Sequence, residues 1–353
     1  MQIIYSFNKT GYEAVCWEKE IKNSSHNGVN FIPFNHGKYL DPSLYSEAIN
    51  LDVLYRAKDV RLLNVYIVLQ ELIRKERAEA IIVANAPPYH PDFLRTLDVY
   101  KVLYSADDPG STYLINIPYL HAYNHVFYVN PVYSSDMVMQ EKMRYCGMVN
   151  ADWLPISVFD FEFCASKTQQ LLFSQKRDID IIYVGKFWRQ KLDTLIKIKR
   201  SFAARFKMYG LFRWKHNFYL NIIHRFGSWV KPISCQDRVN LYQRAKIGLN
   251  IHWDQYGLGN QRLYHLPANG AMQISDCADH LGKIFKLENE VVGYRHVDEL
   301  IEKIKYYLDN PAKRQEIARA GYCRVVKEYR FRDVTQKAAV LIQRGMQRLA
   351  WKL

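Results

Sequence analysis

Apolar and polar residues follow two patterns along the first part of the chain. Short runs rich in β-branched and aromatic residues are separated by stretches in which apolar residues recur at helical spacing, as in residues 60–77. The strand-like runs cover residues 2–7, 29–34, 80–85, 101–105 and 126–130. This order of strands and helices predicts a mostly parallel sheet with helices on both faces.

A second series of the same kind lies further along the chain. Its strand-like runs cover residues 179–184, 206–209, 247–252, 271–275 and 291–294. Both patterns fade over residues 153–178, where we expect a linker. The predicted parts are a Rossmann-like domain over residues 1–155, a second over 156–330, and a long amphipathic helix over 331–353. Two such domains facing each other leave a cleft at the carboxyl ends of their strands, where open α/β sheets bind ligands.

Length and composition agree with this division. The 353 residues are 49% hydrophobic and 24% charged, which suits two globular domains and argues against a disordered chain, collagen or a disulfide-stabilised miniprotein. The six cysteines show neither a C-x-x-C pair nor a zinc-ligand spacing, which is typical of reduced thiols in a cytoplasmic protein. The sequence shows no signal-peptide pattern and no transmembrane segment. We therefore expect any membrane contact to be peripheral.

The positive charge of the chain is confined to its C-terminal part. The formal net charge is +14; residues 1–155 carry 14 basic and 17 acidic side chains, a net −3, so the remaining residues carry +17. Residues 186–246 hold 15 Lys and Arg but only Asp193 and Asp237 as acids, interleaved with aromatic residues. Such a segment favours an anionic partner. The alternative interpretation is a solvated helical face over an aromatic core.

The first candidate site follows the strand at 179–184. This strand runs into Gly185, and Lys186, Arg189 and Lys191 stand at the start of the next helix. A strand–glycine–helix turn presents free backbone N–H groups at the positive end of a helix dipole, and the nearby cations would neutralise a diphosphate. The G-x-x-x-x-G-K-[ST] spacing is missing, which argues against a P-loop NTPase. A solvated strand–helix turn is the alternative interpretation.

The second candidate site follows the strand at 247–252. Arg262, Tyr264 and His265 open a short helix that ends at Gly270, so we expect their side chains at the mouth of the same cleft. His252 at the strand end equally suits a histidine without a ligand.

The first domain offers a pair of adjacent carboxylates. Asp107 and Asp108 follow the strand at 101–105. Adjacent carboxylates repel, which raises the pKa of one of them and suits a general base or a hydrogen bond to a sugar hydroxyl. Asp-Asp-Pro-Gly is also ordinary turn chemistry. Gly11 and Glu13, after the first strand, are predicted to belong to a loop that approaches a substrate.

Taken in order, these segments resemble the CgeB-like (spore-maturation type) glycosyltransferases, a branch of the GT-B enzymes related to the group-1 glycosyltransferases. The segments that carry the resemblance are residues 183–186, 245–250, 260–264, Gly270, 314–321 and, in the first domain, 105–109. The chain departs from these relatives at His265, where they usually have a glutamate on the ribose hydroxyls, and at Gly257, where many have a second glutamate. The imidazole of His265 retains the ability to form a hydrogen bond with ribose.

The resemblance implies the GT-B fold, with a C-terminal helix that crosses back to the first domain. It implies a nucleotide-sugar donor, UDP- or GDP-linked, held mainly by the second domain, and an acceptor held mainly by the first. It also implies hexosyl transfer without a cofactor or metal, because basic side chains and a helix N-terminus replace the divalent cation at the diphosphate. The predicted donor-binding residues are Gly185, Lys186, Arg189, Tyr209, His252, Asn260, Arg262, Tyr264, His265 and Gly270, and the acceptor-side loop contains Gly11 and Glu13.

The expected reaction is transfer of a sugar to a hydroxyl group. Lys186, Arg189 and Arg262 would stabilise the charge that develops on the leaving diphosphate. In an inverting enzyme Asp107 is the predicted base, with Asp108 next; in a retaining enzyme both would position the acceptor.

Three kinds of acceptor and three interpretations of the basic segment stay open. The expected acceptor is a glycan, a lipid-linked glycan or a protein. One alternative function is that of a phage-type glucosyltransferase, which modifies hydroxylated DNA bases. The other is that of a non-catalytic nucleotide-binding protein of the same fold. Residues 186–246 either dock on the anionic inner face of a membrane, bind nucleic acid, or bind nothing.

Overall fold

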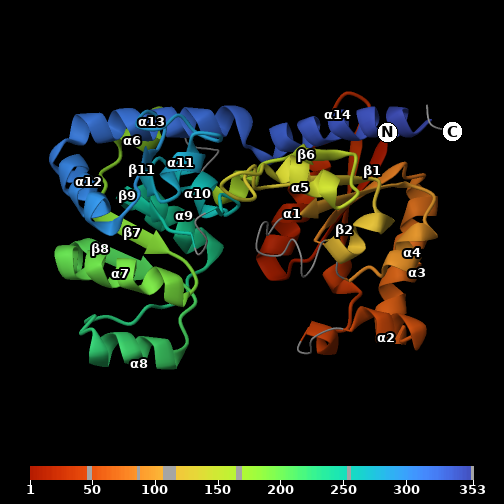
Figure 1. Ribbon diagram of the computed structural model, residues 1–353, viewed down its shortest axis with the longest axis horizontal. Helices are drawn as coiled ribbons and strands as arrows, with labels where there is room; N and C mark the ends of the chain where they lie inside the picture. The colour runs from red at the N-terminus through yellow and green to blue at the C-terminus, as the bar shows by residue number, and fades with distance from the viewer. Residues whose placement is uncertain (46–49, 86–87, 106–116, 164–168, 253–255, 351–353) are drawn as a thin grey trace. The chain divides into compact units, whose positions relative to one another are not determined.

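The computed structural model describes residues 1–45, 50–85, 88–105, 117–163, 169–252 and 256–350, and the chain forms two compact units (Figure 1). The first unit comprises Met1–Phe159 together with Phe331–Leu353, and the second comprises Asp160–Arg330. The C-terminal helix thus returns to the first unit, as the predicted fold requires. Within the described residues, no helix combines the length and the apolar composition needed to cross a bilayer.

The first unit is built on a parallel sheet, which has six strands in the described residues. The strands are β1 (Gln2–Phe7), β2 (Asn30–Asn35), β3 (Ala80–Ala84), β4 (Tyr100–Ser105), β5 (His125–Tyr128) and β6 (Ala151–Trp153), in the order β2-β1-β3-β4-β5-β6. Strand β1 lies between β2 and β3, with Ile4 opposite Ile32 on one side and Ile81 on the other. The sequence pattern missed β6, because three residues are too few to show an alternation.

Helices cover both faces of this sheet. They are α1 (Gly11–Asn23), α2 (Leu51–Arg56), α3 (Val60–Glu76), α4 (Pro91–Arg95), α5 (Met139–Tyr145) and α14 (Phe331–Ala350). Residues of α3 and α4 share one apolar cluster with the strands. On the other face α14 packs beside α1: Phe331 contacts Trp17, and Gly345 lies so close to the Tyr100 hydroxyl that a side chain would not fit there.

The second unit repeats this plan on a smaller sheet. Its strands, all parallel, are β7 (Ile179–Val184), β8 (Phe206–Tyr209), β9 (Ala245–Asn250), β10 (Met272–Ser275) and β11 (Val292–Gly293), in the order β11-β10-β9-β7-β8. The strand order reverses between β7 and β9, so that the chain leaves the carboxyl ends of these two neighbouring strands toward opposite faces. We call this place the switch point; such points are the usual ligand positions of doubly wound sheets.

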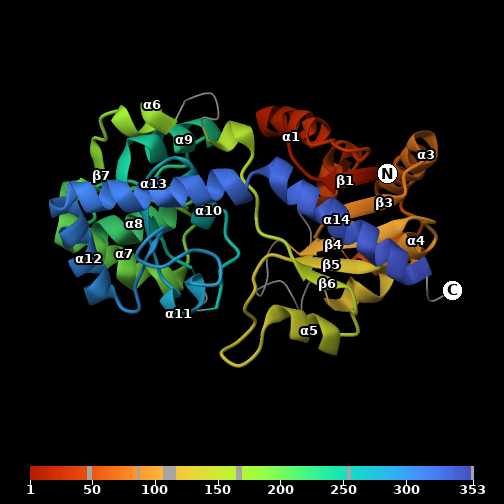
Figure 2. The ribbon, with the colours of Figure 1, turned by 90° about the horizontal axis from the view of Figure 1, so that it is seen from above.

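Helices also cover both faces of the second sheet. They are α6 (Gln169–Ser174), α7 (Arg189–Phe202), α8 (Trp214–Ile223), α9 (Cys235–Arg244), α10 (Arg262–Ala268), α11 (Ala278–Leu281), α12 (Val297–Asp309) and α13 (Pro311–Glu328). The large core cluster joins α7 and α12 to one face, a smaller cluster joins α9 and α10 to the other, and α13 packs on α10. Figure 2 looks onto α13 and α14, each in front of the strands of its own unit. The predicted class, two parallel α/β units, is confirmed.

Candidate functional site

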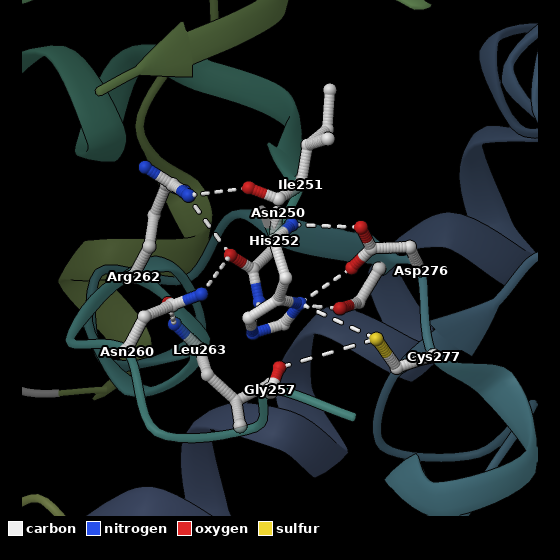
Figure 3. Close-up of polar contacts among 10 residues, drawn as sticks. Asn250, Ile251, His252, Gly257, Asn260, Arg262, Leu263, Asp276 and Cys277 are labelled. Carbon is white, nitrogen blue, oxygen red and sulfur yellow. Dashed lines mark hydrogen bonds and ion pairs between the residues drawn. The ribbon is translucent and has the colours of Figure 1, made fainter. Parts of the chain in front are cut away.

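The guanidinium group of Arg262, the first residue of α10, lies at the switch point (Figure 3). Its Nη1 donates to the carbonyl oxygen of Val184 at 2.6 Å and its Nη2 to that of Ile251 at 2.9 Å. Its Nε donates to the Asn250 side chain at 3.1 Å. A guanidinium has five N–H groups, so in the described residues two remain for a ligand. Arg262 therefore joins the ends of β7 and β9 and still offers a charged donor.

Glycine is required where β7 and β8 end. A Cβ atom at Gly185 would lie 2.5 Å from the Tyr183 hydroxyl and 2.7 Å from Arg262 Nη1. Gly210, with a φ of +140°, would place its Cβ only 1.8 Å from the Gly185 carbonyl oxygen. The predicted Gly185 thus makes room for Arg262, and Gly210, which the sequence analysis did not select, makes room for Gly185.

A second cation, Lys191, is buried beside Arg262. It is the third residue of α7, and only 5% of its surface is exposed. Burial, with a smaller contribution from the Arg262 charge, lowers the pKa of Lys191 from 10.5 to about 7, while the Asp276 carboxylate acts in the opposite direction. Among the described residues, no carboxylate forms an ion pair with Lys191 or Arg262. Two neighbouring cations without such a partner are costly unless an anion binds there.

Asp276, which follows β10, holds His252 in a fixed orientation. One carboxylate oxygen accepts from the His252 backbone N–H at 2.7 Å, and the other lies 2.5 Å from the ring Nδ1. This contact assigns the proton to Nδ1, which leaves Nε2 as an acceptor 3.4 Å from the Asn250 amide nitrogen. The Asn250 oxygen in turn accepts from Arg262 and from Asn260 at 3.0 Å. One hydrogen-bonded chain thus joins Asp276 to Arg262.

Cys277 completes a group that offers metal-ligand atoms. His252, Asp276 and Cys277 each place one such atom within 4.8 Å of the others. Imidazole, carboxylate and thiolate are ligands of Zn²⁺. The Cys277 sulfur lies 3.9 Å from His252 Nδ1, the same nitrogen that faces Asp276. A metal would therefore have to replace the imidazole–carboxylate hydrogen bond.

The two other cations predicted at the diphosphate, Lys186 and Arg189, lie on the surface. Both side chains are exposed, and no described residue pairs with them. They flank the start of α7, as predicted, but they stand in solvent, whereas Lys191 two residues further on is buried. The predicted donor-binding residues therefore omitted Lys191, the buried cation of this turn.

Four other predicted donor-binding residues lie away from Arg262 in the second unit. Tyr264 and His265 are buried rather than at a cleft mouth: Tyr264 packs on Tyr329, and His265 is 3.1 Å from a Glu162 oxygen. Gly270, with a φ of +70°, follows the end of α10 on the way into β10, at the opposite edge of the sheet from the switch point. Tyr209 packs against the apolar cluster beneath α9 and α10, and only its backbone oxygen reaches Gly185. The expectation that Tyr264 and His265 lie at the mouth of a cleft is therefore wrong, whereas the donor-binding roles of Gly270 and Tyr209 stay predictions.

Gly11 and Glu13, predicted in an acceptor-side loop, lie instead in the first turn of α1, at the corresponding edge of the first unit. Gly11 begins α1 with a φ of +57° and open space around it, and Glu13 pairs with Lys9 at 3.0 Å. Asn35, at the end of β2, fixes the residues just before α1 through two hydrogen bonds with the Lys9 backbone. Asp107 and Asp108 lie outside the described residues, so their assignment stays a prediction.

A buried polar group near this edge escaped the sequence analysis. The Ser6 hydroxyl lies 2.7 Å from the Tyr89 hydroxyl and 3.0 Å from His36 Nδ1. Burial lowers the pKa of His36 from 6.5 to about 4, so the ring is neutral at pH 7. Ser6 and His36 stand at the ends of β1 and β2. Their positions after strand-like runs of the sequence could have identified them as candidates.

Comparison with known families gives one match. A family model described as glycosyl transferase-like matches residues 186–339, which span most of the second unit, with Lys191 and Arg262, and part of α14. No curated protein matches the chain.

The similarity to solved structures covers nearly the whole chain. A glycosyltransferase from Rickettsia africae is 13% identical, with 98% of each chain covered and a TM-score of 0.62. Sucrose-phosphate synthase from Thermosynechococcus elongatus is 12% identical, with 97% of this chain and 98% of that one covered and a TM-score of 0.61. HepE from Anabaena, in complex with UDP-glucose, is 11% identical, with 99% of each chain covered and a TM-score of 0.60. These similarities establish the GT-B fold.

Proposed function

We propose that the protein is a glycosyltransferase that moves a sugar from a nucleotide-diphosphate-sugar to a hydroxyl acceptor, and that Lys191 and Arg262 bind the diphosphate. The observation that carries this proposal is the pair of cations at the switch point, which have no carboxylate partner in the described residues. The match to a glycosyl transferase-like family over residues 186–339 supports the reaction class.

Lys191 and Arg262 suit the leaving group of such a reaction. Cleavage of the sugar–phosphate bond adds negative charge to the diphosphate, and cations already held in place stabilise that charge without reorganisation. Arg262 is fixed by three hydrogen bonds and still has two N–H groups to give. This positive charge takes the place of a divalent cation, so we propose that transfer does not require a metal. Activity that survives exhaustive treatment with EDTA tests this point.

UDP-linked hexoses are the first donors to test. UDP-glucose is the ligand named for the HepE structure, which shares the fold of this chain. We propose that Lys186 and Arg189, exposed at the start of α7, bind the donor from the solvent side. We propose that a sugar hydroxyl donates to His252 Nε2 in place of the Asn250 amide nitrogen, which lies 3.4 Å from it. The CgeB-like assignment is part of this proposal.

The acceptor side is proposed for the first unit. Gly11 and Glu13 lie at the carboxyl edge of its sheet, where acceptors are expected. Asp107 is proposed as the base of an inverting reaction, with Asp108 next. Glycans, lipid-linked glycans and proteins are the acceptor classes that this arrangement serves, and the fold is compatible with a hydroxylated DNA base.

The decisive experiment measures release of nucleoside diphosphate from a panel of UDP- and GDP-sugars with water as acceptor. We expect one donor to be hydrolysed slowly, and Arg262→Lys to lower this rate about 100-fold, because lysine cannot reproduce the fork of hydrogen bonds. The matched control is Arg295→Lys, since Arg295 is exposed on the same unit and its guanidinium pairs with the surface carboxylate of Asp279. Release from no donor, or an Arg262→Lys rate equal to that of the wild type in a folded protein, would refute the proposal.

A further inference from the structure

Residues 210–231, which we call the 210–231 segment, expose an unusual number of large apolar side chains. The segment lies between β8 and α9 and contains α8, which Figure 1 shows at the periphery of the second unit. Its large apolar side chains that are between 43% and 72% exposed are Leu211, Trp214, Phe218, Tyr219, Ile222, Ile223 and Trp229. Contiguous apolar surface of this kind is rare on soluble monomers and marks an interaction site.

These exposed side chains are not needed to fold the segment. Its two ends meet where the Gly210 N–H donates to the Lys231 carbonyl oxygen at 2.9 Å. Inside, the Asn217 amide bonds both backbone groups of Val230, at 2.7 and 3.1 Å. The residues that anchor the segment in the core are Phe212, Leu220, Phe226 and Val230. A separate set of residues therefore holds the segment in place and leaves its outer surface without a structural role.

Helix α8 carries its apolar residues on the outward face. Trp214, Phe218 and Ile222 follow one another at a spacing of four and line one side of the helix. The face toward the protein contains Asn217 and Leu220, both buried. This arrangement is the reverse of an ordinary surface helix, whose apolar stripe faces the core.

The same surface is positively charged. Arg213, Lys215, Arg225 and Lys231 are all exposed, and residues 210–231 contain no Asp or Glu. No carboxylate among the described residues pairs with any of these four cations. Two copies meeting through this surface would bring like charges together, which opposes self-association.

We propose that the 210–231 segment docks on an anionic lipid bilayer. Trp and Tyr suit the interface between headgroups and acyl chains, and the aliphatic side chains Ile222 and Ile223 suit the region just beneath it. The flanking cations would meet anionic headgroups. Nucleic acid fits less well, because aliphatic side chains neither stack on bases nor neutralise phosphates. The proposal concerns this surface alone and holds whether or not the protein transfers a sugar.

Flotation of the full chain with two kinds of vesicle tests the docking. Vesicles of phosphatidylglycerol and phosphatidylcholine should carry the protein upward, and vesicles of phosphatidylcholine alone should carry much less. Combining Trp214→Ser, Phe218→Ser and Ile222→Ser should lower the partition coefficient at least about tenfold. Arg213→Gln with Lys215→Gln should lower it about thirtyfold at low salt, since each cation near an anionic surface contributes about 1 kcal/mol.

Matched changes elsewhere control for a general loss of apolar surface. Val60, Ile67 and Val149, in the first unit, are similarly exposed, and their combined change to Ser should leave flotation unchanged. The proposal is overturned if this control loses as much binding as the α8 variant. It is also overturned if the wild-type protein does not float but forms a dimer that the α8 variant disrupts. A third contrary result is tighter binding to duplex DNA than to vesicles, weakened by the charge variant and not by the α8 variant.

Discussion

The switch point and the 210–231 segment both carry cations without carboxylate partners in the described residues, but their surroundings are opposite. At the switch point the partly buried Arg262 bonds the ends of β7 and β9, and burial lowers the pKa of Lys191 beside it to about 7. In the 210–231 segment the cations stand in solvent among exposed aromatic and aliphatic side chains. A buried cation selects one small anion held at fixed geometry, whereas exposed cations on an apolar surface suit an extended anionic surface.

The largest effect is expected from Lys191→Met, which removes the charge and keeps the length of the side chain. Nucleoside diphosphate release should fall by a factor of about 10² to 10³, the range for one lost charge-stabilising donor. The free energy of unfolding at pH 7 should rise by about 2 kcal/mol, because a buried cation is replaced by an apolar group. Steady-state assays and urea titrations measure the two changes.

The same substitution at an exposed cation of the 210–231 segment should have a much smaller effect on stability. Lys215→Met should change the unfolding free energy by less than about 0.5 kcal/mol, as surface substitutions usually do. Lys313→Met, on the surface of α13, is the control for activity. If Lys191→Met lost both stability and activity, Lys191 would be part of the core packing and not a binding group.

The next effect concerns how tightly the chain is packed around two glycines of the 210–231 segment, one beside the switch point and one in its outer part. Gly210→Ala should lower the unfolding free energy by about 3 kcal/mol, because the added Cβ meets the Gly185 carbonyl oxygen and φ is +140°. Gly227→Ala, in the outer part of the 210–231 segment, should cost about 1 kcal/mol, since its φ is +68° but no atom lies within 4 Å of the added Cβ. Equal losses in denaturant titrations would show that the end of β8 relaxes freely.

The pH dependence of donor binding should distinguish the buried lysine from the exposed cations. The pKa of Lys191 in the free protein is about 7, so above that pH a diphosphate must bind together with a proton. The affinity for UDP-glucose should therefore fall as pH rises, by up to about tenfold for each unit above 7, and should be constant below 7. Calorimetry in buffers of different ionisation enthalpy measures both the affinity and the proton uptake. A flat profile for the wild type, equal to that of Lys191→Met, would contradict this role.

Much of the fold was predictable because strands and helices leave local patterns. All five strands of the second unit were found. The burial of Lys191 was also within reach: Leu195, Ile198 and Phe202 follow it at helical spacing, so Lys191 lies on the apolar stripe of α7. Lys186 and Arg189 lie off this stripe. The prediction treated the cations after β7 as one group and so did not separate the buried lysine from the two exposed cations.

Other parts of the site depend on contacts between distant residues. His265 is buried because Glu162, more than a hundred positions earlier, contacts it, and Tyr264 because Tyr329 covers it. The joining of Val184 to Ile251 by Arg262 likewise requires the strand order of the folded sheet. No local pattern contains this information, whereas Asp276 was open to prediction as the first residue after a strand.

The smallest effect is expected where the 210–231 segment is changed on its outer face. Trp214→Ser, Phe218→Ser and Ile222→Ser together should alter the unfolding free energy by less than about 0.5 kcal/mol, although three large apolar side chains are removed. The reason is that Leu220, Phe226 and Asn217 hold the segment from its inner face. Leu220→Ser supplies the comparison and should cost about 3 kcal/mol, because Leu220 is fully buried. A large loss in the triple variant would mean that these side chains pack on the unit itself, and the contrast between a buried anion site and an exposed docking surface would then fail.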